Sequence, residues 1–198
     1  MEFVRQPEVD EASHEDRISV RMDWPTFEAF LVARGDTGPR VTFLDGVLEL
    51  MSPSFNHELV ANSISRLLET WSLEFDVELN ALGSLTIKKS RKQAGVEPDK
   101  CYFVGPVGSR RTPDLAIEVI WSSPLLDKLE VYRRLGVREV WVWEAGRITP
   151  WFLGTAGYTR NRKSRVLPDF DLGLLSKFVT RVDQHAAVKA YRLALRSN

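Results

Sequence analysis

Residues 97–128 of this chain read EPDKCYFVGPVGSRRTPDLAIEVIWSSPLLDK. Two apolar runs in this stretch are rich in β-branched and aromatic residues, which predicts two strands joined by a loop. A Pro-Asp pair precedes each run, with the aspartates at Asp99 and Asp114. The second run is interrupted by Glu118, and a carboxylate within an apolar strand is costly to bury unless it is paired or binds a metal. We therefore expect the functional site in this stretch.

The predicted strands 100–104 and 114–119 are close enough in sequence to pair as an antiparallel hairpin around the intervening loop. A register that pairs Asp99 with Glu118 centres the turn within that loop and brings their Cβ atoms to about 5 Å. Asp114 lies on the same face as Glu118 but about 13 Å away, too far to share one ion. We interpret Asp114 as structural. Facing carboxylates repel unless a cation lies between them.

This pair of acids predicts a binding site for a hard cation, because carboxylate oxygens are the ligands that Mg²⁺ and Mn²⁺ prefer. Such an ion acidifies water and neutralises charge on a phosphoryl group. Lys128 follows the strand that carries Glu118 and is a candidate to hold the attacking water or to stabilise negative charge. His57 and Glu58 begin a predicted long helix and are candidates to complete the metal shell or to bind its waters.

Composition excludes several other kinds of site. The chain has 198 residues with equal numbers of acidic and basic side chains, so nothing compels a polyanion partner. A single cysteine excludes a disulfide framework, and three separated histidines exclude the Cys/His spacing of a zinc site. No apolar run reaches the roughly 18 residues that a membrane span needs. The acidic start is unlike a signal peptide, so we expect a cytoplasmic protein without membrane contact.

The charge is unevenly distributed along the chain. Residues 1–18 contain six acids and two arginines, and we expect this acidic segment to be a flexible tail. Residues 19–198 are expected to form one domain, since this length buries a sufficient core. Two basic clusters, 88–92 and 160–165, lie in predicted loops. They are either phosphate-backbone contacts or solvated loop charges.

Helical and strand patterns alternate along the rest of the chain. Asp45-Gly46 and Ala145-Gly146 each separate two apolar runs and predict β-hairpins. Apolar residues at helical spacing predict a long helix over 56–75, and two further helices are expected near 172–179 and 183–196. A shorter helix is expected from Ser122 to Leu135. Together these elements predict an α/β or α+β fold in which one mixed sheet is flanked by helices.

Asp99, Glu118 and a nearby lysine resemble the PD-(D/E)xK pattern of nucleases with the restriction-endonuclease-like fold. The likeness is closer to the Uma family of that superfamily, which is widespread in bacteria. Four blocks in the right order carry this resemblance, namely LDGVLELMSPSFNHE (44–58), GVEPDKCYF (95–103), PDLAIEV (113–119) and DKLEVYRRLGVREVWVW (127–143).

The resemblance implies a restriction-endonuclease-like central mixed sheet, a metal on Asp99 and Glu118, and Lys128 as the catalytic lysine. It also implies that Glu49 and His57 are accessory site residues. The chain departs from the wider superfamily at Ile120, where the lysine of the ExK motif would lie. Lys128 must therefore reach the site from the following helix.

Three functions are compatible with the sequence. The first is an endonuclease that uses Mg²⁺ or Mn²⁺ to hydrolyse phosphodiester bonds of DNA. The second is a catalytically inactive nuclease fold that acts as a binding or regulatory module, which the neutral net charge and the displaced lysine favour. The third, a dimeric structural protein, is suggested by the aromatic strand at 141–143 and the apolar C-terminal helix. Because related nuclease folds often dimerise, we expect a homodimer.

Overall fold

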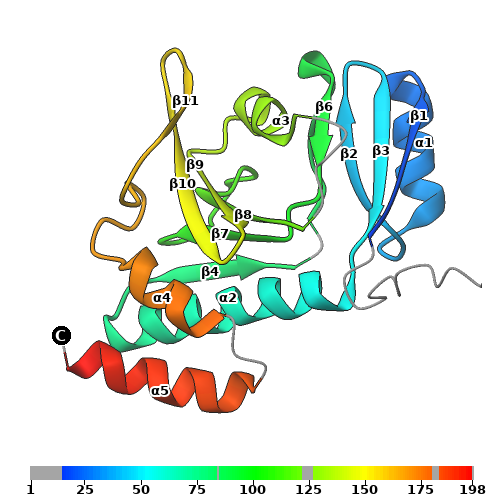
Figure 1. The fold of residues 1–198 in the computed structure, drawn as a ribbon. Helices are drawn as coiled ribbons and strands as arrows, with labels where there is room; N and C mark the ends of the chain where they lie inside the picture. Colours follow the sequence, from blue (N-terminus) through cyan, green and yellow to red (C-terminus); the bar gives the residue numbers. More distant parts are fainter. Residues whose placement is uncertain (1–14, 84, 122–126, 180–182, 198) are drawn as a thin grey trace, which may run out of the picture.

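The computed structural model describes residues 15–83, 85–121, 127–179 and 183–197, which form two β-sheets and their flanking helices (Figure 1). The first sheet is antiparallel throughout, in the order β1-β3-β2-β6-β5. Its strands are β1 (Asp16–Arg21), β2 (Arg40–Leu44), β3 (Val47–Ser52), β5 (Ile87–Lys89) and β6 (Ala94–Val96).

The second sheet is mixed, with the order β11-β10-β9-β8-β7-β4, and only its β8 and β9 run parallel within the described residues. Its strands are β4 (Leu79–Leu82), β7 (Lys100–Val104), β8 (Leu115–Ile120), β9 (Glu139–Glu144), β10 (Arg147–Gly154) and β11 (Gly157–Arg160). The helices are α1 (Trp24–Arg34), α2 (Phe55–Glu74), α3 (Lys128–Leu135), α4 (Leu172–Val179), α5 (Gln184–Arg196) and the short 3₁₀ helix η2 (Ser90–Lys92).

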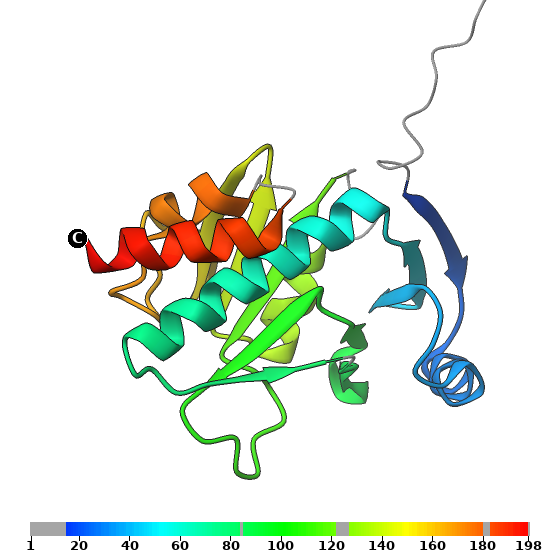
Figure 2. The same ribbon diagram turned by 90° about the horizontal axis from the view of Figure 1, so that it is seen from below.

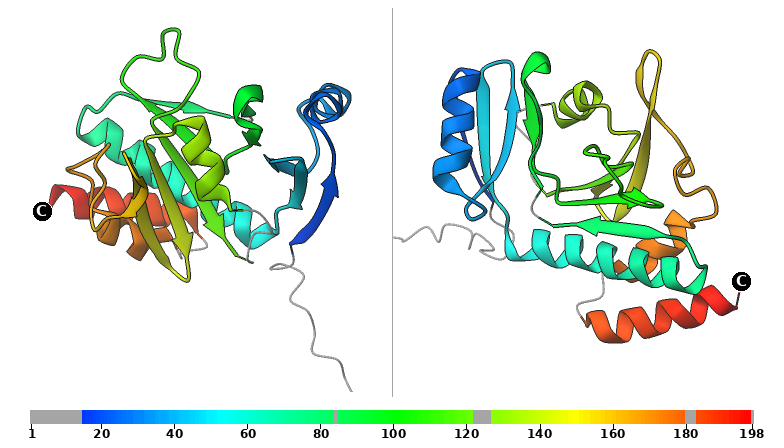
Figure 3. Two further views of the ribbon diagram at one scale, coloured as in Figure 1. Left: turned by 90° about the horizontal axis from the view of Figure 1, so that it is seen from above. Right: turned by 180° about the vertical axis from the view of Figure 1, so that it is seen from behind.

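Different helices cover different faces of the two sheets (Figures 1 and 2). Helices α2, α4 and α5 cover one face of the mixed sheet and share its main core. Helix α3 lies on the opposite face, between the mixed sheet and the antiparallel sheet (Figure 3). Helix α1 packs on the other side of the antiparallel sheet, where an aromatic cluster forms. The space around α3 is therefore bordered by both sheets.

Alternation along β8 decides which of its side chains reach that space. Leu115, Ile117 and Val119 belong to the core shared with α2. Ala116 belongs to the core shared with α3, and Glu118 has the same parity as Ala116. The strand thus turns three apolar side chains toward α2 and presents one carboxylate toward α3.

The predicted hairpin register is confirmed, because Lys100 pairs with Ile117 and Cys101 with Ala116. Continuing this register by one position places Asp99 opposite Glu118. The hairpins at Asp45-Gly46 and Ala145-Gly146 and the long helix α2 are also confirmed. The expected start of a helix at Ser122 lies outside the described residues, and α3 begins at Lys128.

A single layer of sheet was expected, whereas the chain forms two sheets. Strands β6 and β11 lie in segments that were predicted to be loops, and each has only three or four residues. Strand β1 begins at Asp16, inside the segment predicted to be a tail. Only two apolar residues, Ile18 and Val20, alternate with polar ones in β1, and both are exposed, so the strand signal in the sequence is short. No helix in the described ranges is long and apolar enough to cross a membrane.

Gly95 in β6 lies beside the ring of Phe27 from α1. A Cβ atom at this position would lie 3.1 Å from two ring carbons of Phe27, which is itself fully buried. We expect Gly95→Ala to lower the free energy of unfolding by about 1–3 kcal/mol, since the ring has no room to move. Gly83→Ala is the control, because nothing lies within 4 Å of its Cβ position. Equal urea midpoints for the two variants would contradict this packing.

Candidate active site

Asp99 and Glu118 are two buried carboxylates at the end of the β7–β8 pair, exposed by only 5% and 3%. The backbone N–H of Val119 donates a hydrogen bond of 2.7 Å to Oδ2 of Asp99. This bond ties Asp99, which precedes β7, to the residue that follows Glu118. The two acids are therefore held by the strand pairing and do not depend on a flexible loop.

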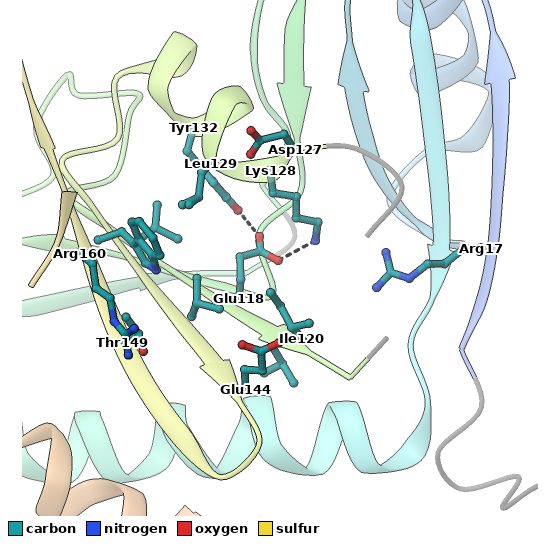
Figure 4. Close-up of a pocket in the computed structure, with 14 residues that line it drawn as sticks. Arg17, Glu118, Ile120, Asp127, Lys128, Leu129, Tyr132, Glu144, Thr149 and Arg160 are labelled. Atoms are coloured by element: carbon teal, nitrogen blue, oxygen red, sulfur yellow. Dashed lines mark hydrogen bonds and ion pairs between the residues drawn. The ribbon is translucent and has the colours of Figure 1, made fainter. Parts of the chain in front are cut away.

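Helix α3 supplies the partners of Glu118 (Figure 4). Nζ of Lys128 lies 2.6 Å from Oε2 of Glu118, and the hydroxyl of Tyr132 donates a hydrogen bond to Oε1. Lys128 and Tyr132 are four residues apart and lie on the same side of the helix. Asp127 caps the helix by accepting from the backbone N–H of Glu130 at 3.1 Å. The cap fixes the first helical turn, which carries Lys128.

Two cationic side chains approach Asp99 from other elements. Oδ1 of Asp99 lies 3.0 Å from Nε2 of His57 in α2 and 3.2 Å from Nε of Arg40 in β2. Both contacts are close enough for ion pairs but poorly directed for hydrogen bonds, and Oδ1 has no hydrogen bond to any of the described residues. Nδ1 of His57 lies 2.6 Å from Oε1 of Glu15. The imidazole thus bridges two acids.

The surroundings of the two central acids shift their pKa values in opposite directions. Burial alone would raise the pKa of Asp99, but the contact with His57 and the charge of Lys128 outweigh burial and lower this pKa. Burial is the main cause that raises the pKa of Glu118, and the negative charge of Asp99 adds to it; together they outweigh the lowering by Lys128 and Tyr132. The ionised form is therefore favoured at Asp99 and disfavoured at Glu118.

The cations of the site are kept charged by the same acids. Burial lowers the pKa of His57, but its contacts with Asp99 and Glu15 outweigh burial and raise this pKa to about 9. Burial likewise lowers the pKa of Lys128, and the charges of Glu118 and Asp99 raise it by more. The acids of the site therefore stabilise the positive charges of His57 and Lys128.

The remaining predicted residues, Glu49 and Glu58, pair with arginines of the antiparallel sheet around this centre. Glu49 is buried in β3, and its Oε1 lies 2.7 Å from Nη1 of Arg17 in β1. Arg17 also pairs with Glu15 at 3.0 Å and lines the pocket around Glu118. Glu58 pairs with Arg40 at 2.6 Å. Glu49 is thus linked to the centre through Arg17, and Glu58 through Arg40.

Four residues of this cluster were not identified from the sequence, namely Glu15, Arg17, Arg40 and Tyr132. Helical spacing from Lys128 is the signal that could have identified Tyr132. The others come from the antiparallel sheet or the segment before it, and only tertiary packing brings them here. Asp114 is structural, as predicted, since it accepts from the N–H of Val104 at 2.9 Å and pairs with Arg110 and Arg138.

Glu118 lies at the wall of a pocket of about 300 Å³ (Figure 4). Apolar side chains of β8, β9, β10 and α3 form much of this pocket, and Arg17, Lys128 and Arg160 add positive charge. Asp99 lines a second pocket of about 340 Å³ together with Arg40 and other polar side chains. The two central acids therefore face different pockets.

The central acids fit a divalent cation of the Mg²⁺ type. Such an ion is often held by only one or two carboxylates, with water and substrate phosphate as its other ligands. Asp99 and Glu118 supply two carboxylates, and Oδ1 of Asp99 is a buried oxygen that accepts no hydrogen bond from the described part of the chain. Among the residues that the structure describes, no group of three or more His, Cys, Asp or Glu side chains has the arrangement of a metal site. Further ligands would therefore have to be water or substrate oxygens.

Removing the hydroxyl of Tyr132 tests its contribution to this site. We expect Tyr132→Phe to lower the free energy of unfolding by about 1–3 kcal/mol, since a buried carboxylate oxygen loses its donor. Tyr158→Phe is the matched control, because the Tyr158 hydroxyl donates to the neutral carbonyl of Val137 at 2.5 Å. Tyr158→Phe should lower the free energy of unfolding by about 0.5–1.5 kcal/mol. Chemical denaturation would contradict the account if the control lost more stability than Tyr132→Phe.

Comparisons with known proteins identify the family. A search of curated proteins gave no match. A solved structure titled as a "putative nuclease belonging to DUF820" from Anabaena variabilis ATCC 29413 is 11% identical, covers 81% of this chain and 96% of its own, and has a TM-score of 0.47. The sequence model of the Uma2 family, described as "Putative restriction endonuclease", matches residues 24–177. This match spans well over half of the chain and includes Asp99, Glu118 and Lys128, so the protein belongs to the Uma2 family.

Proposed function

We propose that this protein is a divalent-metal-dependent nuclease that hydrolyses phosphodiester bonds of DNA, with Mg²⁺ or Mn²⁺ as its metal. The observation that carries the proposal is the position of Asp99 opposite Glu118, with the ammonium group of Lys128 2.6 Å from Glu118. Two facing carboxylates and a lysine are the chemical groups of the PD-(D/E)xK pattern. Membership of the Uma2 family supports a nuclease-like role.

Asp99 and Glu118 would hold the metal. When bound, the ion would lower the pKa of a water molecule and offset negative charge on the phosphoryl oxygens. The N–H of Val119 and the hydroxyl of Tyr132 each fix the orientation of one of the two carboxylates. Orientation by such bonds is what a metal site requires of its surroundings.

Lys128 would contribute positive charge beside the reacting phosphate. Its ammonium group is nearly buried, and a charge acts more strongly there than in water. His57 and Arg40 contact Asp99 directly and are positioning residues in this scheme. They hold the carboxylate in place and keep it ionised.

One observation favours the second candidate function, a nuclease fold without catalysis that acts as a binding or regulatory module. Both carboxylate oxygens of Glu118 already have protein partners, Lys128 and Tyr132. A cation at Glu118 must therefore compete with the ammonium group of Lys128. In the inactive module the ion pair would persist and the acids would have no affinity for metal.

DNA cleavage decides between the two functions. The experiment incubates supercoiled plasmid and single-stranded DNA with the wild-type protein in Mg²⁺, in Mn²⁺ and in EDTA, beside Asp99→Asn. We expect metal-dependent nicking by the wild type that EDTA abolishes and that falls at least about 100-fold in Asp99→Asn. Cleavage that is unchanged in Asp99→Asn would indicate a contaminating nuclease. No cleavage in any metal would favour the binding module.

A further inference from the structure

Four exposed cations lie on β10, β11 and the segment that follows, namely Arg147, Arg160, Arg162 and Lys163. None of them forms an ion pair with another side chain in the described part of the chain. Glu144 faces Arg147 across the β9–β10 pair, but both side chains are exposed and they do not form an ion pair. No acidic side chain among the described residues therefore neutralises these four charges.

The other basic cluster, around residues 88–92, differs in this respect. Lys88 pairs with Glu28 at 3.0 Å, and Lys89 donates to the backbone carbonyl of Leu135. These two lysines join β5 to α1 and to the end of α3. The cluster thus has a structural role, and its side chains line neither pocket of the candidate site.

The cations on β10 and β11 are continuous with the candidate site. Arg160 and Thr149 line the pocket of Glu118, and Figure 4 shows them on the wall formed by β10 and β11. The same two residues line an open groove of about 420 Å³ outside that pocket, together with Arg147 and Arg162. A path lined by guanidinium groups therefore leads from Glu118 and Lys128 to the outer surface of the β10–β11 hairpin.

We propose that this groove, lined by Arg147, Arg160 and Arg162, binds backbone phosphates of the DNA strand on one side of the bond that is cleaved. The inference rests on the proposed function and adds the path of the substrate. Guanidinium groups bind phosphate oxygens in a bidentate way. Such contacts position a strand without reading its bases. The groove therefore sets the position of the strand relative to Glu118 without selecting a sequence.

The test compares two double variants that each remove two positive charges. Arg147→Gln/Arg162→Gln changes the groove but leaves Arg160, which also lines the Glu118 pocket, in place. Arg91→Gln/Lys92→Gln changes two exposed cations of η2 and is the matched control. Fluorescence anisotropy in EDTA measures the affinity of wild type and both variants for labelled single- and double-stranded DNA at several salt concentrations. EDTA removes the divalent metal, so binding is measured in the absence of cleavage.

We expect the groove variant to bind DNA at least about tenfold more weakly at low salt than the wild type. The slope of log affinity against log salt should fall by about 1–2, one unit for each lost phosphate contact. The control should keep the wild-type affinity and slope. Thermal melting should show equal stability for all three proteins, because the replaced side chains are exposed.

The outcomes separate this inference from the proposed function. Equal binding by wild type and groove variant, with wild-type cleavage intact, would overturn the groove and leave the nuclease. Equal losses in both variants would also overturn it, because the effect would then follow net charge alone. Weakened binding in the groove variant together with an inactive wild type would support the groove and overturn the nuclease. A wild type that binds no DNA would overturn both.

Discussion

Replacing Lys128 by glutamine should reduce DNA cleavage at least about 100-fold and leave the binding of Mn²⁺ as strong as in the wild type, or stronger. The reason lies in the 2.6 Å contact between Nζ of Lys128 and Oε2 of Glu118. The ammonium group and a divalent cation compete for this carboxylate. Glutamine removes the competing charge and keeps a side chain of similar length.

Glu118→Gln is the matched comparison, since it removes the carboxylate and keeps Lys128. It should lose both cleavage and Mn²⁺ binding, as measured by calorimetry and by the plasmid assay. Lys128→Gln also leaves Glu118 buried beside Asp99 without its cation, which costs about 3–5 kcal/mol. Mn²⁺ should therefore raise the melting temperature of Lys128→Gln more than that of the wild type. Loss of Mn²⁺ binding in Lys128→Gln, or cleavage at the wild-type rate, would contradict these roles.

Glu139→Ala should be the most destabilising single change outside the candidate site, with a loss of about 3–5 kcal/mol. Glu139 begins β9 and is fully buried. Its Oε1 accepts from Nε1 of Trp141 at 2.6 Å and from the hydroxyl of Ser164 at 2.5 Å. Its Oε2 accepts from the backbone N–H of Arg165 at 2.7 Å and of Val166 at 3.2 Å. Alanine would leave four donors unsatisfied in the interior.

Urea denaturation of Glu139→Ala measures this cost. Glu144→Ala is the control, because Glu144 ends the same strand and is exposed, and it should change the free energy of unfolding by less than about 0.5 kcal/mol. Equal losses in the two variants would show that the buried bonds of Glu139 do not stabilise the protein. Glu139→Ala should also loosen the segment after β11, because Glu139 accepts hydrogen bonds from its backbone. This segment carries Arg162 of the basic groove.

The central pair of acids was predictable because it depends on local geometry. Asp99 and Glu118 lie in adjacent strands joined by one loop, and an antiparallel pair of that kind has few possible registers. Glu118 was also conspicuous as a carboxylate within an apolar strand. The approach of Lys128 from the next helix followed from its short distance along the chain. Each of these inferences needed only neighbouring elements.

His57, which contacts Asp99, was predicted as a site residue, but the arginines around the two acids could not be predicted in the same way. Arg40 and Arg17 come from the antiparallel sheet, and they reach the mixed sheet only because the two sheets face each other across α3. Strand β1 has only two apolar residues and begins within an acidic segment, so its sequence was interpreted as part of a tail. Glu139 was overlooked because the donors that satisfy it lie 25 to 27 residues further along the chain, apart from Trp141. Such contacts depend on the tertiary fold.

The metal site itself is the central claim, and an anomalous difference map from crystals grown with Mn²⁺ tests it most directly. The account predicts a peak between the carboxylates of Asp99 and Glu118, with Nζ of Lys128 moved away from Oε2 of Glu118. The same crystals of Glu118→Gln should lack the peak. A map of the wild type without a peak between these acids, in which Lys128 still contacts Glu118, would contradict the claim.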